Sequence, residues 1–211
     1  MTRIARLRRS DRRPDRVIVT LDDAPALSIP LDLAIGLRPD QALDERELAA
    51  LRSEADYRRA LDRVLRFLGY RPRSLAEIES YMAGKAVTPA TRERVTRRLT
   101  ELALIDDRAF ARWWVEDRCR HRPRSRRALA FELTRKGVAP GIAAEAVSQV
   151  SDEDAALEAA APRAARLRHQ DADLALRRLT AFLQRRGFDV ATSLAAARAT
   201  LARSVGEGDG E

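Results

Sequence analysis

Cysteine, aromatic residues and long apolar runs are scarce in this chain of 211 residues. Cys119 is the only cysteine, so no disulfide can form within the chain, which agrees with a reducing compartment. Aromatic residues make up 5% of the sequence, so its core must consist mainly of leucine, alanine and valine. No apolar run is long enough to cross a membrane, and the arginine-rich N-terminus lacks the apolar segment of a signal peptide. We therefore expect a cytoplasmic protein that does not enter a membrane.

Residue clusters that carry chemistry are also missing. His121 and His169 each stand alone, without a second histidine or cysteine at the spacing of metal ligands. There is no glycine-rich phosphate loop. Basic neighbours could lower the pKa of Cys119, but no histidine and acid accompany it as in a catalytic thiol, and a packing role fits better. We expect a protein that is not an enzyme and uses no metal or other cofactor.

Basic residues exceed acidic ones, with 40 against 32 and a formal net charge of +8. A basic balance of this size favours an acidic partner, such as nucleic acid or an acidic protein surface. Lys85 and Lys136 are the only lysines. Arginine suits bidentate contacts to phosphate or carboxylate, but a GC-rich genome produces the same bias, so composition alone identifies no partner.

The N-terminal region differs from the rest of the chain. Residues 1–16 carry seven arginines against two aspartates, which is typical of a flexible arm that touches polyanions or is merely solvated. Val17 to Leu21 is β-branched and predicts a strand, and Ala26 to Ile29 can return as its partner after a turn. Asp44 with Glu47 forms a capping box that opens a helix.

A repeat dominates the remainder. Arg71-Pro72-Arg73-Ser74 recurs as Arg122-Pro123-Arg124-Ser125, 51 residues later. The same offset aligns Ile78 with Leu129 and Met82 with Leu133, so the apolar face of a helix is kept. A weaker third copy, which lacks the Arg-Pro-Arg-Ser sequence, follows about 50 residues further on. A period near 50 residues is typical of stacked helical units.

Helix signals divide the chain further. Ser74 with Glu77 forms a second capping box, Thr88-Pro89 starts a helix, and glycines 69, 137 and 187 are natural helix ends. We predict a mostly α protein in which three tandem three-helix repeats form an elongated curved array behind a small N-terminal β-hairpin. The predicted segments are a basic flexible arm (1–16), a β-hairpin and short helix (17–54), three repeats (55–104, 105–150 and 151–203) and an acidic disordered tail (204–211).

The middle repeat carries a recognisable set of motifs. Ile105 to Ala111 reads IDDRAFA and is followed by Trp114-Val115, Arg118, Glu132-Leu133 and Arg135 to Val138. As a set, these residues resemble the signature of the RecX family, whose members have tandem three-helix repeats. The resemblance covers the three repeats, most loosely the third.

The resemblance implies a function. RecX proteins bind the RecA filament on single-stranded DNA along its groove, and they oppose filament growth, ATP hydrolysis, strand exchange and cleavage of the SOS repressor. By resemblance, we expect a monomeric negative regulator of RecA that contacts single-stranded DNA weakly or only through the filament. The alternative is a general nucleic-acid-binding repeat protein without a recombinase partner, which tight binding to naked DNA would favour.

Charge is segregated along the repeats. Residues 117–136 have a balance of +6, residues 138–162 contain five acids and no base, and residues 163–187 have a balance of +5. A charge run is usually just a solvated face, but the first run coincides with the family motif. We therefore predict a binding surface made of Trp113, Arg118, Arg120, Arg122, Arg124, Arg127, Phe131, Arg135 and Lys136.

Several of these residues also have structural interpretations. Arg127, Phe131 and Arg135 are spaced by four and form one stripe, opposite the predicted core residues Leu129 and Leu133. Phe131 could contact a partner or pack under a neighbouring repeat. Trp113 lies at the edge of the apolar face of its helix, where it could be half-buried packing or a partner contact.

Overall fold

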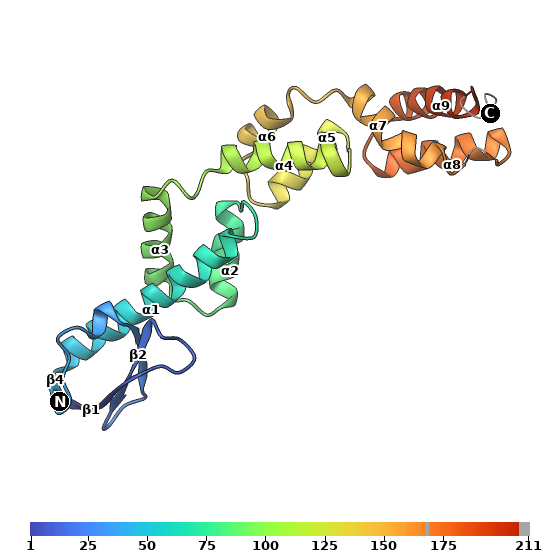
Figure 1. Cartoon of the computed structure of the whole chain (residues 1–211). Helices are drawn as coiled ribbons and strands as arrows, with labels where there is room; N and C mark the ends of the chain where they lie inside the picture. Colours follow the sequence, from blue (N-terminus) through green and yellow to red (C-terminus); the bar gives the residue numbers. More distant parts are fainter. Residues whose placement is uncertain (168, 207–211) are drawn as a thin grey trace. The chain divides into compact units, whose positions relative to one another are not determined.

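The computed structural model describes residues 1–167 and 169–206 (Figure 1). Within this part of the chain, a small antiparallel sheet precedes nine α-helices, which confirms the predicted mostly α fold with an N-terminal hairpin. The chain forms two compact units, one of residues 1–71 with 78–105, and one of residues 72–77 with those from 106 onward. Of the predicted tail, residues 204–206 end the last helix, and 207–211 lie outside the described residues.

The N-terminal sheet contains four strands in the order β3-β2-β1-β4. They are β1 (Thr2–Arg9), β2 (Arg16–Leu21), β3 (Leu27–Pro30) and β4 (Ala42–Leu43), with a 3-10 turn, η1 (Asp32–Ala34), after β3. The predicted hairpin is β2 with β3, in which Val17 faces Ile29 and Val19 faces Leu27. Ile29 and Val19 are fully buried, so the β-branched face of the hairpin forms the sheet's core.

The predicted flexible arm over residues 1–16 is wrong, because half of it, Thr2–Arg9, forms β1. Ile4 is fully buried and pairs with Leu21 across the β1–β2 ladder. The prediction weighed the arginines of this segment and overlooked the apolar residues between them. These residues hold β1 in the sheet between β2 and β4. Arg16 is only 3% exposed; its guanidinium donates to Ser28 and lies 3.6 Å from the Asp62 carboxylate. Burial lowers the pKa of Arg16, and the nearby Arg59 lowers it further.

Helix α1 (Glu45–Leu68) links the sheet to the first repeat. Its start has the predicted capping box, in which Asp44 accepts from the Glu47 amide and Glu47 from the Asp44 amide. The helix runs through residue 54, where we placed the end of the N-terminal region. Its first half packs on the sheet, and its second half shares a core with α2 (Leu75–Gly84) and α3 (Pro89–Glu101).

In the described residues from 106 onward, the second compact unit has six helices in two sets of three. Repeat 2 consists of α4 (Asp107–His121), α5 (Arg126–Arg135) and α6 (Pro140–Val147), and repeat 3 of α7 (Asp152–Ala164), α8 (Ala172–Arg185) and α9 (Val190–Gly206). Leu129 and Leu133 of α5 are fully buried, as predicted, and so are their counterparts Leu179 and Leu183 of α8. Each set of helices encloses its own apolar core.

Hydrogen bonds at the start of α5 join repeat 2 to repeat 3. Ser125 caps α5 by accepting from the Ala128 amide, and its own amide donates to the Arg186 carbonyl at 3.3 Å. The Arg126 amide donates to Asp152, in the first turn of α7, at 2.7 Å. Repeat 3 therefore satisfies amide groups that a helix cannot satisfy itself at its N-terminus.

The same chemistry recurs where residues 72–77 meet α4 and α5 within this compact unit. The Ser74 hydroxyl donates to the Lys136 carbonyl at 2.6 Å, and the Leu75 amide donates to Asp107 at 2.9 Å. The repeated Arg-Pro-Arg-Ser sequence thus ends in a serine that meets the next pair of helices. Repeat 3 lacks this sequence, and its α8 is capped locally by Asp171, which accepts from the Leu174 amide.

Glycine makes both joints possible. Gly137 and Gly187 follow α5 and α8 with φ of +80° and +95°, where other residues are strained. A Cβ on Gly137 would lie 2.2 Å from the Ala76 side chain, and one on Gly187 would lie 2.6 Å from the Ser125 hydroxyl. In the first repeat, Ala86 occupies the equivalent position with φ of +54°.

Gly187→Ala is expected to lower the free energy of unfolding by about 3 kcal/mol, because it combines left-handed strain with overpacking against Ser125. Urea denaturation followed by circular dichroism measures the loss. Gly141→Ala is the matched control, since a Cβ there meets nothing within 4 Å. Equal stability of Gly187→Ala and the wild type would show that the joint adapts without cost.

Ala86→Gly is expected to have the opposite effect and raise the free energy of unfolding by up to about 1 kcal/mol. Glycine relieves the left-handed strain at this exposed position, and the gain is reduced by the greater entropy of the unfolded chain. The control Ala49→Gly, on the exposed face of α1, should instead destabilise by about 1 kcal/mol. Thermal denaturation midpoints distinguish the two; a lower midpoint for Ala86→Gly would contradict the assignment of strain.

Candidate functional site

The predicted binding residues come from α4, α5 and the turn between them. Trp113, Arg118 and Arg120 lie on α4, and Arg127, Phe131 and Arg135 on α5. Arg122 and Arg124 belong to the turn, and Lys136 is the residue that ends α5. The structure divides this set into side chains held by internal contacts and side chains that face solvent.

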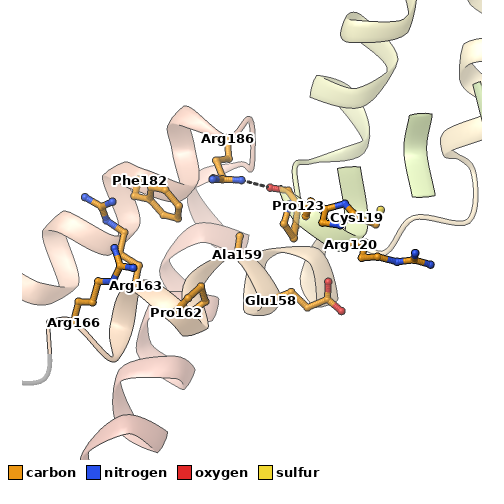
Figure 2. A pocket seen from close by; sticks show the side chains of 11 residues that line it. Cys119, Arg120, Pro123, Glu158, Ala159, Pro162, Arg163, Arg166, Phe182 and Arg186 are labelled. Atoms are coloured by element: carbon orange, nitrogen blue, oxygen red, sulfur yellow. Dashed lines mark hydrogen bonds between the residues drawn. The ribbon is translucent and has the colours of Figure 1, made fainter. Parts of the chain in front are cut away.

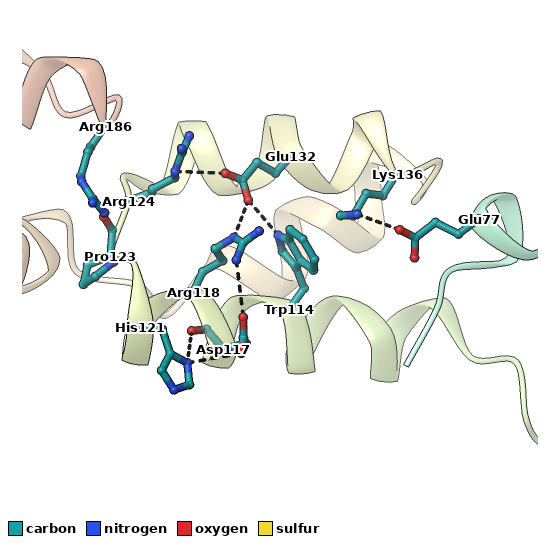
Figure 3. A network of polar contacts seen from close by, with 10 residues as sticks. All are labelled: Glu77, Trp114, Asp117, Arg118, His121, Pro123, Arg124, Glu132, Lys136 and Arg186. Carbon is teal, nitrogen blue, oxygen red and sulfur yellow. Dashed lines mark hydrogen bonds and ion pairs between the residues drawn. The ribbon is translucent and has the colours of Figure 1, made fainter. Parts of the chain in front are cut away.

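Glu132 is the centre of the internal contacts (Figure 3). One carboxylate oxygen accepts from the Trp114 indole and from the Arg118 guanidinium, each at 3.0 Å. The other oxygen lies 3.1 Å from Nε of Arg124. Because its side chain is only 19% exposed, Glu132 holds these partners in a partly desolvated place where charged hydrogen bonds are strong. Arg118 and Arg124 are therefore committed to holding α4 against α5.

Two cationic side chains lie against the Trp114 indole. The guanidinium carbon of Arg118 lies 4.0 Å from the centre of an indole ring, and Nζ of Lys136 lies 4.2 Å from it. These are distances at which the ring attracts a cation. Lys136 also pairs with Glu77 at 2.8 Å, and both side chains are about four-fifths buried (Figure 3). Lys136 thus connects α5 to the segment 72–77 and has little charge to offer a partner.

An outward stripe remains on α5. Arg127, Phe131 and Arg135 are exposed, and Phe131 has 62% of its surface open to solvent. The guanidinium carbon of Arg135 lies 5.9 Å from the centre of the Phe131 ring. Phe131 packs under no neighbouring repeat within the described part of this compact unit. A large exposed aromatic between two arginines is costly to keep solvated, which favours a contact surface.

The other predicted residues belong neither to the network around Glu132 nor to the α5 stripe. Trp113 is half-buried and its ring centre lies 6.0 Å from that of Phe110, so it packs at the rim of the repeat 2 core. Arg120 and Arg122 are exposed. Cys119 is half-buried, and burial raises the pKa of its thiol, with a further rise from the negative charge of Glu158. This agrees with the packing role that we favoured for it.

A second basic feature was not predicted residue by residue. A cleft of about 650 Å³ lies between the end of α4 and helices α7 and α8 (Figure 2). Arg163, Arg166 and Arg186 line it, and Arg163 and Arg186 lie 4.7 and 4.8 Å from the centre of the Phe182 ring. Arg186 also donates to the Pro123 carbonyl at 3.0 Å. The excess of arginine over residues 163–187 indicated this region without showing which side chains converge.

Metal clusters and membrane-spanning helices are absent from the described residues. No group of three or more histidine, cysteine or acidic side chains could hold a metal ion in this part of the chain. No helix within residues 1–167 and 169–206 is long and apolar enough to span a membrane.

Sequence comparisons match both middle segments of the chain to known domains. Residues 60–99 match the family model of the first three-helix domain of RecX, and residues 106–147 match that of the second. The regulatory protein RecX of Chlorobium phaeobacteroides is 34% identical over 137 residues, which cover 65% of this chain and 90% of that protein. RecX of Streptomyces coelicolor is 36% identical over 140 residues, covering 65% of this chain and 74% of the relative.

Solved structures show the same fold. A crystal structure of a regulatory protein RecX superimposes with a TM-score of 0.63 at 21% identity, covering 91% of this chain and 97% of the other. The structure of RecX from Lactobacillus salivarius gives a TM-score of 0.57 at 19% identity, covering 69% of this chain and 96% of the other. With the two matched domains and the close curated relatives, these likenesses show that the chain belongs to the RecX family of regulatory proteins.

Proposed function

We propose that this protein binds the RecA filament on single-stranded DNA and restrains it, opposing filament growth, ATP hydrolysis, strand exchange and cleavage of the SOS repressor. Membership of a family of regulatory proteins supports a regulatory role, and the resemblance of its motifs supports RecA as the partner. In this proposal, the protein acts as a monomer in the cytoplasm and catalyses no reaction itself.

The exposed stripe on α5 is the observation that carries the proposal. Arg127, Phe131 and Arg135 point away from the core residues Leu129 and Leu133, so the fold does not require their charge or bulk. At the equivalent positions α2 has Ala76, Ser80 and Gly84, which offer neither. An aromatic anchor with flanking arginines is the composition found at the energetic centres of protein interfaces.

The internal network supports this surface without forming part of it. Glu132 fixes Arg118 and Arg124 between α4 and α5, and Lys136 is held by Glu77. These contacts fix the rotation of α5 about its axis, so the stripe is presented by a rigid helix. Modest contacts on more than one repeat would then add through avidity, with no deep pocket required.

The purified protein is expected to slow ATP hydrolysis by its cognate RecA on single-stranded DNA at far less than one molecule per RecA subunit. A regulator that acts on a filament affects many subunits through one contact, which is why substoichiometric protein should suffice. The coupled ATPase assay measures the rate in moderate salt. Unchanged hydrolysis at equimolar protein, together with tight binding to naked DNA, would favour the alternative of a general nucleic-acid-binding repeat protein.

The double variant Arg127→Glu with Arg135→Glu is expected to lose most of this inhibition. Exposed charges contribute little to stability, so the free energy of unfolding should change by no more than about 1 kcal/mol. Inhibition of the RecA ATPase and the thermal denaturation midpoint are measured together.

Arg177→Glu with Arg185→Glu is the matched control for this variant. These exposed arginines occupy the same two positions of α8, eight residues apart, with Ala181 in place of the aromatic. The control should inhibit nearly as well as the wild type. If the α5 variant melts normally and still inhibits like the control, the stripe is not the binding surface.

A further inference from the structure

Repeats 2 and 3 can be compared position by position, because their helices share caps and core residues. Asp106 and Ser151 cap α4 and α7, and four buried positions of α4 recur as alanines of α7. On this alignment, Arg118 of α4 corresponds to Arg163 of α7, and Trp114 corresponds to Ala159.

The second helices align just as clearly. Leu129, Leu133 and Gly137 of repeat 2 correspond to Leu179, Leu183 and Gly187 of repeat 3, and all four leucines are fully buried. Lys136 therefore corresponds to Arg186, and Glu132 to Phe182. The pair of cations, one from the first helix and one from the end of the second, is present in both repeats.

What differs is the negative charge. In repeat 2, the ring between the cations is Trp114 of α4, and Glu132 of α5 neutralises Arg118. In repeat 3, the ring between the cations is Phe182, which occupies the position of that glutamate. The position of Asp117, a second carboxylate near Arg118, is taken by Pro162. Repeat 3 therefore has two cations around an aromatic ring, as repeat 2 does, but neither of the two carboxylates.

The arginines of the cleft consequently lack the paired carboxylates that repeat 2 provides. Within the described residues, Arg163, Arg166 and Arg186 form no ion pair; Glu158 lines the same cleft but pairs with none of them. Burial lowers the pKa of Arg186, and the positive charges of Arg124, Arg122 and Arg163 lower it further. A cluster of like charges opposes folding, and one unpaired Glu158 does not balance three arginines, so the excess positive charge of the cleft favours an anionic ligand.

We propose that the cleft lined by Arg163, Arg166, Arg186 and Phe182 binds phosphate groups of a single nucleic-acid strand. Guanidinium groups form bidentate hydrogen bonds to phosphate oxygens, and two of them lie against one ring here. The half-buried Phe182 offers a surface for an unstacked base, which a single strand supplies and a duplex does not. The cleft of about 650 Å³ is of the size that holds a small ligand such as a nucleotide.

An acidic peptide fits the cleft less well. Peptide-binding grooves combine charge with several apolar anchoring positions, whereas this cleft has one aromatic ring, Phe182, and its other apolar lining is small, namely Pro123, Ala159 and Pro162. A polyanionic strand needs no such anchor. The inference deepens the proposed function, in which the partner filament contains single-stranded DNA, but it concerns the DNA alone.

The experiment measures binding of a fluorescently labelled oligothymidylate strand to the full chain by anisotropy, over a range of salt concentrations and without RecA. The double variant Arg163→Gln with Arg186→Gln should bind about tenfold more weakly, and its salt slope should fall by about 0.7 for each phosphate that it no longer neutralises. Arg177→Gln with Arg185→Gln, which removes the same charge from α8 outside the cleft, should bind almost like the wild type.

Phe182→Glu provides a test that does not remove an arginine. It places in repeat 3 the carboxylate that repeat 2 has at Glu132, so the cleft should neutralise itself and bind the strand much more weakly. The thermal denaturation midpoint, measured alongside, should show a folded protein with a modest loss of stability, because Phe182 also packs against the core. Wild-type binding by this variant would overturn the proposal, as would equal weakening of binding in the cleft variant and the Arg177, Arg185 control.

Competition distinguishes the sources of phosphate. Inorganic phosphate in excess over the strand should displace it only weakly, because one phosphate lacks the linked contacts of a chain. Displacement by low concentrations of free phosphate would overturn the assignment to a strand. Loss of RecA inhibition in the cleft variants with unchanged strand binding would overturn it too. Absence of RecA inhibition in the wild type, by contrast, would refute the proposed function and leave the strand measurement valid.

Discussion

The unsatisfied amides at the start of a short helix are the constraint on which the second compact unit depends. Helix α5 has ten residues, so the groups at its N-terminus are a large share of its backbone. Ser125 satisfies the Ala128 amide from within the repeat, and Asp152 of α7 satisfies the Arg126 amide. A helix of repeat 2 is therefore complete only when repeat 3 is folded beside it. The start of α5 thus depends on the unit that follows it in the chain, which here is repeat 3.

Once these joints and the cores are formed, the arrangement of charge follows. Glu132 and Glu77 take up the charge of Arg118, Arg124 and Lys136, so these cations act inside the protein. Among the arginines without such an internal acid are those of the α5 stripe and of the cleft of repeat 3. A net charge of +8 is thus an unspecific description, because the binding surfaces that we propose depend on which arginines have an internal acid and which do not.

Much of this fold could be predicted from local sequence rules. Capping boxes at Asp44 and Ser74, the cap at Asp106 and the buried pair Leu129 and Leu133 all follow from short patterns, and the structure contains each of them. The strand β1 was missed because its arginines outweighed its alternating apolar residues. Strand pairing of Ile4 with Leu21 depends on contacts between segments, which a charge count does not describe.

The candidate site was predictable only in part, for a related reason. Spacing placed Phe131 and its arginines on an outer face, because a single helix determines that property. The network around Glu132 joins α4, α5 and the turn between them, so a run of arginines in the sequence could not show that Arg118 and Arg124 are already paired. The cleft around Phe182 involves helices of two repeats, and comparing offsets of 45 and 50 residues would have been needed to notice the exchanged glutamate.

The absence of the Arg-Pro-Arg-Ser sequence from repeat 3 has a consequence for how such a protein can grow by duplication. Repeat 2 presents the same chemistry at both of its joints: Asp107 and Gly137 receive the segment around Ser74, and Ser125 meets Asp152 and Gly187. A tandem copy of residues 105–150 would therefore find compatible partners on either side. A copy of repeat 3 placed after itself would not, since the segment before α8 has no Arg-Pro-Arg-Ser sequence and so lacks the serine that meets the following helices. Inserting further middle repeats would therefore lengthen this architecture with its joints intact, whereas a second copy of the third repeat would leave a joint without its serine.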